Sequence, residues 1–310
     1  MRSKFLFGLM ISILLSVLAV AGQKPASTRT ITVLSEPNAI VWLDGVKYGT
    51  TDADGKLTIK NAPAGKHALR VRADGFKEGA QNLLSAQNGD VKIALVKTTD
   101  EAELAFQEAE KLTLVDRQEA IKAYQKAIKL RPRYPEAYLA LARVSMDAGD
   151  VDGAFKAVKQ AQKLRPAYAE ASAVEGRIHV TNGDEKKAIV AYKRAIAEGK
   201  GFQPEAFTGL GLLYKEKAEM SAGEGDFESE KANYELATAN LKKSAAQLGV
   251  APDAITIYQL LGLAYERMKN YKEAIALYEE FLELFPDSSE ASAVKSFIVQ
   301  IKKQMSEEQQ

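Results

Sequence analysis

Few residues in this chain of 310 are suited to catalysis. There is no cysteine, which removes disulfides, thiolate nucleophiles and cysteine metal ligands. The two histidines, His67 and His179, are more than a hundred residues apart and fall in segments of different structural type, so a Ser-His-Asp set is not expected. His179 is better explained as a packing residue between helices than as a ligand or a base. We therefore predict that the protein is not an enzyme and needs no cofactor and no metal.

One acidic turn was considered as a calcium site. Asp52 and Asp54 precede Gly55, as in a calcium-binding loop, but the position that should close such a loop is Asn61 instead of a bidentate glutamate. A turn held by bonds from side chain to backbone is the favoured interpretation.

Two arginines are better candidates for a binding role. Arg143 and Arg177 lie 34 residues apart, which is one full period of a repeat described below. Side chains at equivalent positions of neighbouring repeats face the same channel, so this pair could grip a carboxylate or the C-terminus of a peptide. The alternative is that both arginines are solvated or paired within the chain.

These arginines are placed by a helical hairpin that recurs along the chain. In residues 135–168, apolar residues at helical spacing form a first helix, Gly149-Asp150 breaks it, a second helix follows, and Pro166 ends it. The small residue Ala142 is matched after 34 residues by Gly176, and Gly211 and Gly262 follow. Glycine inside a helix is unfavourable, so close helix contact is the expected reason for it. The pattern resembles the tetratricopeptide repeat.

The resemblance implies a superhelical solenoid with about five hairpins over residues 101–288 and a capping helix over 289–305. The acidic, glycine-rich segment 220–230 is expected to be a loop inserted between the two helices of the fourth repeat. In this family, positions of the first helices line a concave groove that binds a protein or peptide partner. Projecting that register onto this sequence gives the candidate partner-binding residues Leu139, Arg143, Asp147, Arg177, Thr208, Gln259 and Arg267.

The N-terminal segment 30–97 alternates apolar and polar residues, and its turn signals include Asp44-Gly45. Its sequence, with Glu36-Pro37-Asn38-Ala39 near the start and Pro63-Ala64-Gly65 later, resembles the PEGA domain of prokaryotic envelope proteins. A carboxypeptidase regulatory-like domain is the alternative. Both imply a small, non-catalytic β-sandwich, whose core we expect to rest on Trp42, Phe76 and branched aliphatic residues. The fold class is thus multidomain: a small all-β sandwich followed by an all-α superhelical solenoid.

The first 21 residues have the features of a signal peptide. Arg2 and Lys4 precede an apolar run of sixteen residues, 5–20, and Ala19-Val20-Ala21 supplies the small residues that a signal peptidase reads. A membrane-spanning helix needs about 20 apolar residues, so an uncleaved anchor is the weaker alternative. We expect a protein exported to the periplasm or cell envelope of a bacterium, with no stable membrane span after cleavage.

Charge and composition limit the partners further. The formal net charge is +1, so no global field would attract nucleic acid or anionic lipid, and binding to either would need a local patch. We expect no nucleic-acid partner. The leading hypothesis is an exported scaffold that binds a protein or peptide in its groove, while the sandwich positions it in the envelope. The alternative is a protein that binds carbohydrate or peptidoglycan through the sandwich, with Trp42 or Tyr48 as a ring that stacks on a sugar.

Export gives the first testable prediction. N-terminal sequencing of the protein purified from cells that express it should find Gly22 as the first residue, because the apolar run is short and ends in a cleavage motif. Recovery of intact Met1 in a membrane fraction would instead identify residues 5–20 as an anchor.

Overall fold

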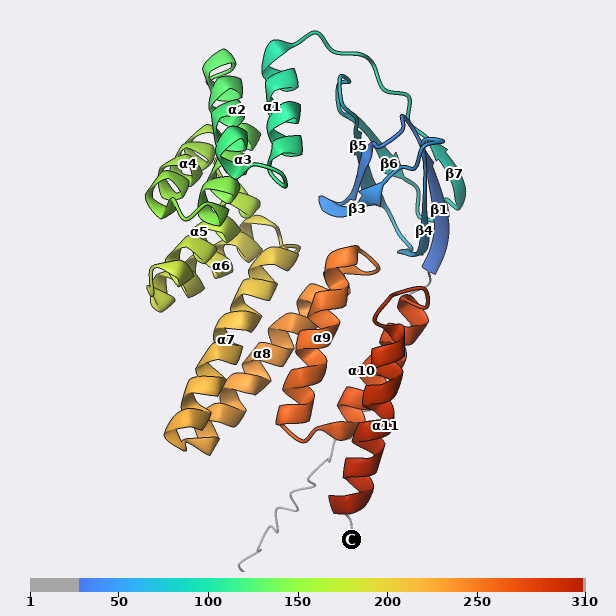
Figure 1. Cartoon of the computed structure of the whole chain (residues 1–310), viewed down its shortest axis with the longest axis vertical. Coiled ribbons are helices and arrows are strands. Elements are labelled where there is room, and N and C mark those ends of the chain that lie inside the picture. Colours follow the sequence, from blue (N-terminus) through green and yellow to red (C-terminus); the bar gives the residue numbers. More distant parts are fainter. Residues whose placement is uncertain (1–27, 309–310) are drawn as a thin grey trace, which may run out of the picture.

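The computed structural model describes residues 28–308, and over this range a β-sandwich is followed by eleven helices (Figure 1). The sandwich consists of β1 (Thr28–Leu34), β2 (Ile40–Leu43), β3 (Val46–Thr50), β4 (Lys56–Pro63), β5 (His67–Arg72), β6 (Gly79–Leu83) and β7 (Gly89–Lys92). One sheet has the order β4-β1-β7, in which β1 and β7 are parallel. The other has the order β3-β2-β5-β6 and is antiparallel.

Alternating side chains of the strands form the sandwich core. Ile31, Val33, Val41 and Val71 are fully buried between the sheets. Trp42 was expected in this core, but it is only partly buried. Because Val41 and Leu43 take the inward positions of β2, the intervening Trp42 must point to the outer face of its sheet.

Two turns of the sandwich form as expected. Asp44 and Gly45, with φ of 51° and 84°, join β2 to β3, and positive φ at both positions is what a tight two-residue hairpin requires. In the turn before β4, Oδ1 of Asp52 accepts hydrogen bonds from the backbone N–H groups of Asp54 and Lys56, each at 2.9 Å. The carboxylate is therefore used to hold the turn, as the sequence predicted.

The helices form five antiparallel hairpins and a final single helix. The pairs are α1 (Glu101–Leu112) with α2 (Arg117–Leu130), α3 (Pro135–Asp147) with α4 (Val151–Leu164), α5 (Ala169–Thr181) with α6 (Glu185–Glu198), α7 (Pro204–Glu224) with α8 (Phe227–Leu248), and α9 (Pro252–Arg267) with α10 (Tyr271–Leu284). The last helix, α11 (Ala291–Glu308), packs on α10. In the second, third and fourth hairpins the first helices are α3, α5 and α7. Each of these contacts the next, and together they form the inner wall of the array.

The predicted loop at 220–230 is wrong. Both helices of the fourth hairpin continue through this segment, so that α7 has 21 residues and α8 has 22, and only Gly225 and Asp226 separate them. Gly225 has φ of 77°, and the N–H groups of Gly225 and Asp226 bond back to the carbonyls of Ala222 and Ser221, which is a Schellman ending. Asp226 then caps α8 by accepting from the N–H of Ser229. The insertion lengthens the hairpin instead of interrupting it.

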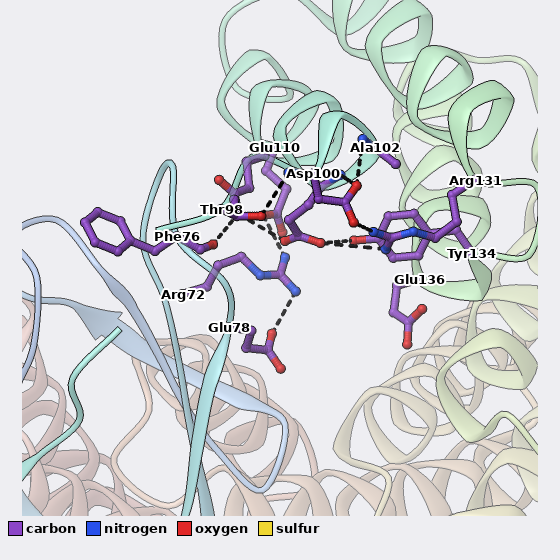
Figure 2. Close-up of polar contacts among 12 residues, drawn as sticks. Arg72, Phe76, Glu78, Thr98, Asp100, Ala102, Glu110, Arg131, Tyr134 and Glu136 are labelled. Carbon is purple, nitrogen blue, oxygen red and sulfur yellow. Dashed lines mark hydrogen bonds and ion pairs between the residues drawn. The ribbon is translucent and has the colours of Figure 1, made fainter. Parts of the chain in front are cut away.

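The sandwich contacts the first hairpin through a polar cluster (Figure 2). Arg72 on β5 binds Glu110 on α1 and Glu78, each at 2.8 Å. Burial alone would lower the pKa of Arg72, but the two carboxylates raise it above its ordinary value. The amide of Gln107 on α1 accepts from the N–H of Gly75 and donates to the carbonyl of Phe76, both at 2.8 Å. These bonds fix the sandwich against α1.

The sandwich also contacts the far end of the array, which the sequence did not indicate. The Tyr48 hydroxyl on β3 donates to the carbonyl of Leu248, at the end of α8, at 3.3 Å. Lys60 on β4 pairs with Asp287, beyond α10, at 3.0 Å. The buried residues of the sandwich form one hydrophobic cluster with those of α8 to α11. One small domain thus joins the first hairpin to the last repeats, as its place beside both α1 and α9 in Figure 1 shows.

Close helix contact inside the hairpins depends on glycine at the expected positions. A Cβ on Gly176 would lie 2.5 Å from ring atoms of Tyr192, and one on Gly262 would lie 2.1 Å from the hydroxyl of Tyr278. By contrast, a Cβ on Gly223 near the end of α7 would meet nothing within 4 Å. Gly176 and Gly223 are therefore matched helical glycines that differ in available space.

We predict that Gly176→Ala lowers the free energy of unfolding by about 1–3 kcal/mol, because the methyl group forces the Tyr192 ring to move in a packed interface. Gly223→Ala should leave it unchanged or raise it by up to about 1 kcal/mol, since alanine favours helix and has room there. Denaturant unfolding followed by circular dichroism measures both. Equal effects of the two substitutions would show that space at Gly176 is not limiting.

Candidate functional site

The two arginines predicted to line the groove are paired within the chain. Arg143 on α3 binds both carboxylate oxygens of Glu205 at the start of α7, with Nη1 to Oε1 at 3.0 Å. Burial would lower the pKa of Arg143, but Glu205 raises it. Arg177 on α5 contacts Asp147 on α3 at 3.4 Å, and its Nε is buried without a hydrogen-bond partner among the described residues. The alternative of pairing within the chain is thus the one that the structure supports.

Two other predicted groove residues do not face an open channel. Leu139 is 7% exposed and packs in the hydrophobic cluster of α3, α4 and α5. The Thr208 hydroxyl lies 2.7 Å from that of Ser244 on α8, so it faces the partner helix of its own hairpin. The projected register is therefore wrong at these positions, because Leu139 packs against α4 and α5 and Thr208 faces α8. Curvature of the array also brings Arg143 on α3 within reach of Glu205 on α7.

Small residues on α5 allow this curvature. Ala169, Ala171, Ala173 and Gly176 are all buried, and so are five of the other nine residues of the helix. The one buried carboxylate on α5, Glu175, is bonded to Lys159, Gln162 and Arg194 at 2.7–2.8 Å. Burial acts to raise the pKa of Glu175, but these partners lower it below its ordinary value. The middle of the array is therefore a packed wall in which the buried carboxylate of Glu175 is paired within the chain.

An open cavity lies further along, between α7, α8, α9 and α11. Its volume is about 400 Å³, and its lining includes Leu263 and Arg267, which project from α9 at successive turns. The other lining residues are Lys215, Glu219, Tyr234, Ala264, Glu266, Tyr271 and Gln304. Leu263 is 54% exposed, which is unusual for a leucine in the middle of a packed helix.

The charged groups of this cavity leave one cation available. Lys215 is bound to Glu219 at 2.6 Å, and Glu266 accepts a hydrogen bond from the Tyr278 hydroxyl at 2.8 Å. Arg267 is exposed and forms no ion pair with any residue between 28 and 308. A guanidinium beside an exposed leucine can bind a carboxylate and an adjoining apolar side chain.

The other predicted groove residues are also accounted for. Gln259, one turn before Leu263 on α9, is exposed, and Asp147 is exposed but engaged by Arg177. Of the predicted set, Gln259 and Arg267 of α9 lie at an open surface, whereas the others are buried or are engaged by partners within the chain. Sequence reasoning missed Lys215, Tyr234 and Gln304, because α7, α8 and α11 meet α9 only in the folded array.

Neither aromatic residue proposed for sugar stacking is available. Tyr48 is 8% exposed and lies against α8, and burial raises its pKa to about 12. The guanidinium groups of Arg70 and Arg72 lie over the Trp42 ring, 5.0 and 5.4 Å from its centre. A sugar would have to displace both cations from Trp42. The stacking hypothesis is wrong for Tyr48 and has no open ring to use at Trp42.

Both histidines have structural surroundings. His67 Nδ1 lies 2.5 Å from Oδ2 of Asp44, so it braces the β2–β3 turn. His179 is 9% exposed and packs edge-on against Phe155, which confirms the predicted packing role. In the described part of the chain no three acidic or histidine side chains are grouped to hold a metal ion. None of the helices between residues 28 and 308 has the length and apolar character needed to cross a membrane.

Comparison with family models assigns both parts of the chain. Residues 28–98 match the PEGA domain. Residues 117–147 match a TPR repeat, 135–212 a tetratricopeptide repeat-like domain, and 255–288 a tetratricopeptide repeat. No curated protein matches the sequence significantly.

Solved structures that resemble the chain are also repeat proteins. Yeast Tom70 has a TM-score of 0.52 and 19% identity, covering 67% of this chain and 41% of its own, which shows a shared fold only. The MamA protein has a TM-score of 0.42 and 26% identity, covering 61% of this chain and 94% of its own. A thermophilic TPR protein of Thermus thermophilus has a TM-score of 0.47 and 22% identity, covering 64% and 98%. The TM-scores of the last two are lower, and nothing is inferred from them.

The repeats indicate a scaffold for protein–protein interaction, and repeat proteins of this kind are generally not catalysts. PEGA domains occur in extracellular and periplasmic proteins. The family matches, the two sheets and the successive hairpins all agree: the chain carries an N-terminal PEGA domain followed by tetratricopeptide repeats.

Proposed function

We propose that this protein is an exported scaffold that binds a protein partner through the cavity between α7, α9 and α11. The unpaired guanidinium of Arg267 is the observation that carries the proposal. Many of the other charged side chains along the inner wall are engaged by partners from the chain itself, and Arg143 is the clearest case. Arginine is among the residues that most often carry the binding energy of a protein interface, and an exposed apolar residue beside it can be covered by the partner.

The chemistry of the cavity defines the partner more closely. A carboxylate, from an acidic side chain or a C-terminus, would bind Arg267, and a neighbouring apolar side chain would cover Leu263. Hydrogen bonds to a charged group contribute about 1.5–3 kcal/mol each, which corresponds to about tenfold or more in affinity. The volume of about 400 Å³ suits one or two side chains of a peptide, not a whole helix.

The sandwich has a supporting role in this proposal. Its contacts with α1 and with the end of α8 hold the two ends of the array, and we propose that it also positions the protein in the cell envelope. The occurrence of PEGA domains in extracellular and periplasmic proteins supports that location. No observation favours a glycan, because Trp42 and Tyr48 are both engaged.

Site-specific crosslinking in cells tests the cavity. A photoreactive amino acid at position 263 should form an adduct with a discrete envelope protein, identified by mass spectrometry, because Leu263 is exposed at the cavity. Arg267→Glu should reduce the adduct about tenfold or more, since it replaces the cation by an anion that repels the carboxylate. Circular dichroism should be unchanged, because Arg267 is exposed and unpaired.

The matched control is Lys295→Glu, which makes the same charge change at an exposed position of α11 that does not line the cavity. It should leave the adduct at position 263 intact. Absence of any protein adduct at 263, or equal loss with both variants, would refute the cavity as the partner site.

A further inference from the structure

The helices differ in the sign of their net charge, although the whole chain is nearly neutral. The second helices of the first three hairpins are basic: α2 has four basic and one acidic residue, α4 has three and one, and α6 has four and two. By contrast, α1 and α10 each have one lysine and four glutamates. The near-zero net charge therefore hides a strongly basic region formed by α2, α4 and α6.

These three helices form the outer side of the array. The inner wall is made by α3, α5 and α7, which touch one another directly, and each of α2, α4 and α6 packs against the inner helices before and after it. The basic residues point to solvent: Lys122, Lys126, Lys129, Lys156, Lys163, Lys186 and Lys193 are all exposed. Each of these second helices therefore presents exposed lysines on the outer, convex side of the array.

Most of these cations have no counterion from the chain. Lys122 pairs with Glu119, but in residues 28–308 no ion pair involves Lys126, Lys129, Lys156, Lys163, Lys186 or Lys193. Unpaired cations repel one another wherever they lie within the screening length of about 8–10 Å at moderate salt, so an array of them costs free energy. An external anionic surface would relieve that repulsion.

The repeat period places these lysines in rows. Lys122 on α2 and Lys156 on α4 are 34 residues apart, and so are Lys129 and Lys163. Val190 on α6 continues the first row and is 64% exposed. Two further exposed apolar residues, Leu114 at 92% and Val115 at 84%, stand in the turn immediately before α2. The surface therefore combines ordered positive charge with scattered exposed aliphatic side chains.

We propose that the convex face of α2, α4 and α6 docks on an anionic phospholipid surface. Lysine is a compact point charge that suits mobile headgroups, and the exposed aliphatic side chains can enter the interfacial layer. Single-stranded nucleic acid is less well matched, because binding it relies on exposed aromatic rings. The aromatic residues of these helices, Tyr124, Phe155 and Tyr192, are buried or partly buried.

Vesicle sedimentation tests the proposal with the chain from Gly22 to Gln310, which lacks the apolar leader and keeps every described element. This protein should sediment with phosphatidylcholine vesicles that also contain phosphatidylglycerol, and not with phosphatidylcholine alone. Raising the salt concentration should release it. Replacing Lys122, Lys129, Lys156 and Lys163 by glutamate should weaken binding at least about tenfold, because each lysine near the surface adds attraction.

The matched control reverses four exposed lysines elsewhere, Lys231, Lys272, Lys295 and Lys303, and so gives the same net charge. Its affinity for the vesicles should stay within about twofold of that of the unmodified chain, because the proposal makes binding depend on the position of the lysines and not on the net charge. Melting curves of both variants check that they fold. Failure to bind vesicles with phosphatidylglycerol, or equal loss in both variants, would overturn the proposal. Tighter binding to a DNA duplex than to these vesicles at the same salt would also overturn it.

Discussion

The close packing around α5 is the constraint on which the rest of the array depends. Gly176 on α5 leaves room for the Tyr192 ring of α6, and the same ring approaches Gly209 on α7, so two inner helices pack against one side chain of an outer helix. Convergence brings Arg143 within reach of Glu205, two hairpins away. The Arg143–Glu205 pair closes part of the inner surface in the middle of the array, whereas an open cavity lies beside α9.

Most of the fold could be read from local patterns, because hairpins, caps and small residues are set by nearby sequence. The turn between α7 and α8, which was not predicted from the sequence, also has a local sequence signal. Gly225-Asp226 has the same form as Gly149-Asp150, which was recognised as a helix break, and in both pairs the glycine has positive φ and the aspartate begins the next helix. The acidic composition around Gly225 favoured a loop and obscured that signal.

The site was less predictable, because it depends on how far successive hairpins rotate. A register projected from one repeat treats all groove positions as equivalent, but Leu139 is buried and Arg267 is exposed. The pairing of Tyr48 with Leu248 joins residues 200 positions apart in different domains, and no local pattern encodes it. The net charge of the whole chain was uninformative for a similar reason: an average over 310 residues conceals that α2 is basic and α10 is acidic.

A solenoid with two free ends behaves as a spring, whose pitch changes when its ends are pulled apart. In this protein the first hairpin and the last repeats contact the same sandwich, at α1 through Arg72 and Gln107 and beyond α10 through the pair of Lys60 and Asp287. Separation of the ends requires one of these contacts to break before the hairpins can spread. The sandwich and the helices therefore form a closed ring of contacts. Resistance to extension is set first by the contacts between sandwich and helices, and only after they break by the stacking of neighbouring hairpins.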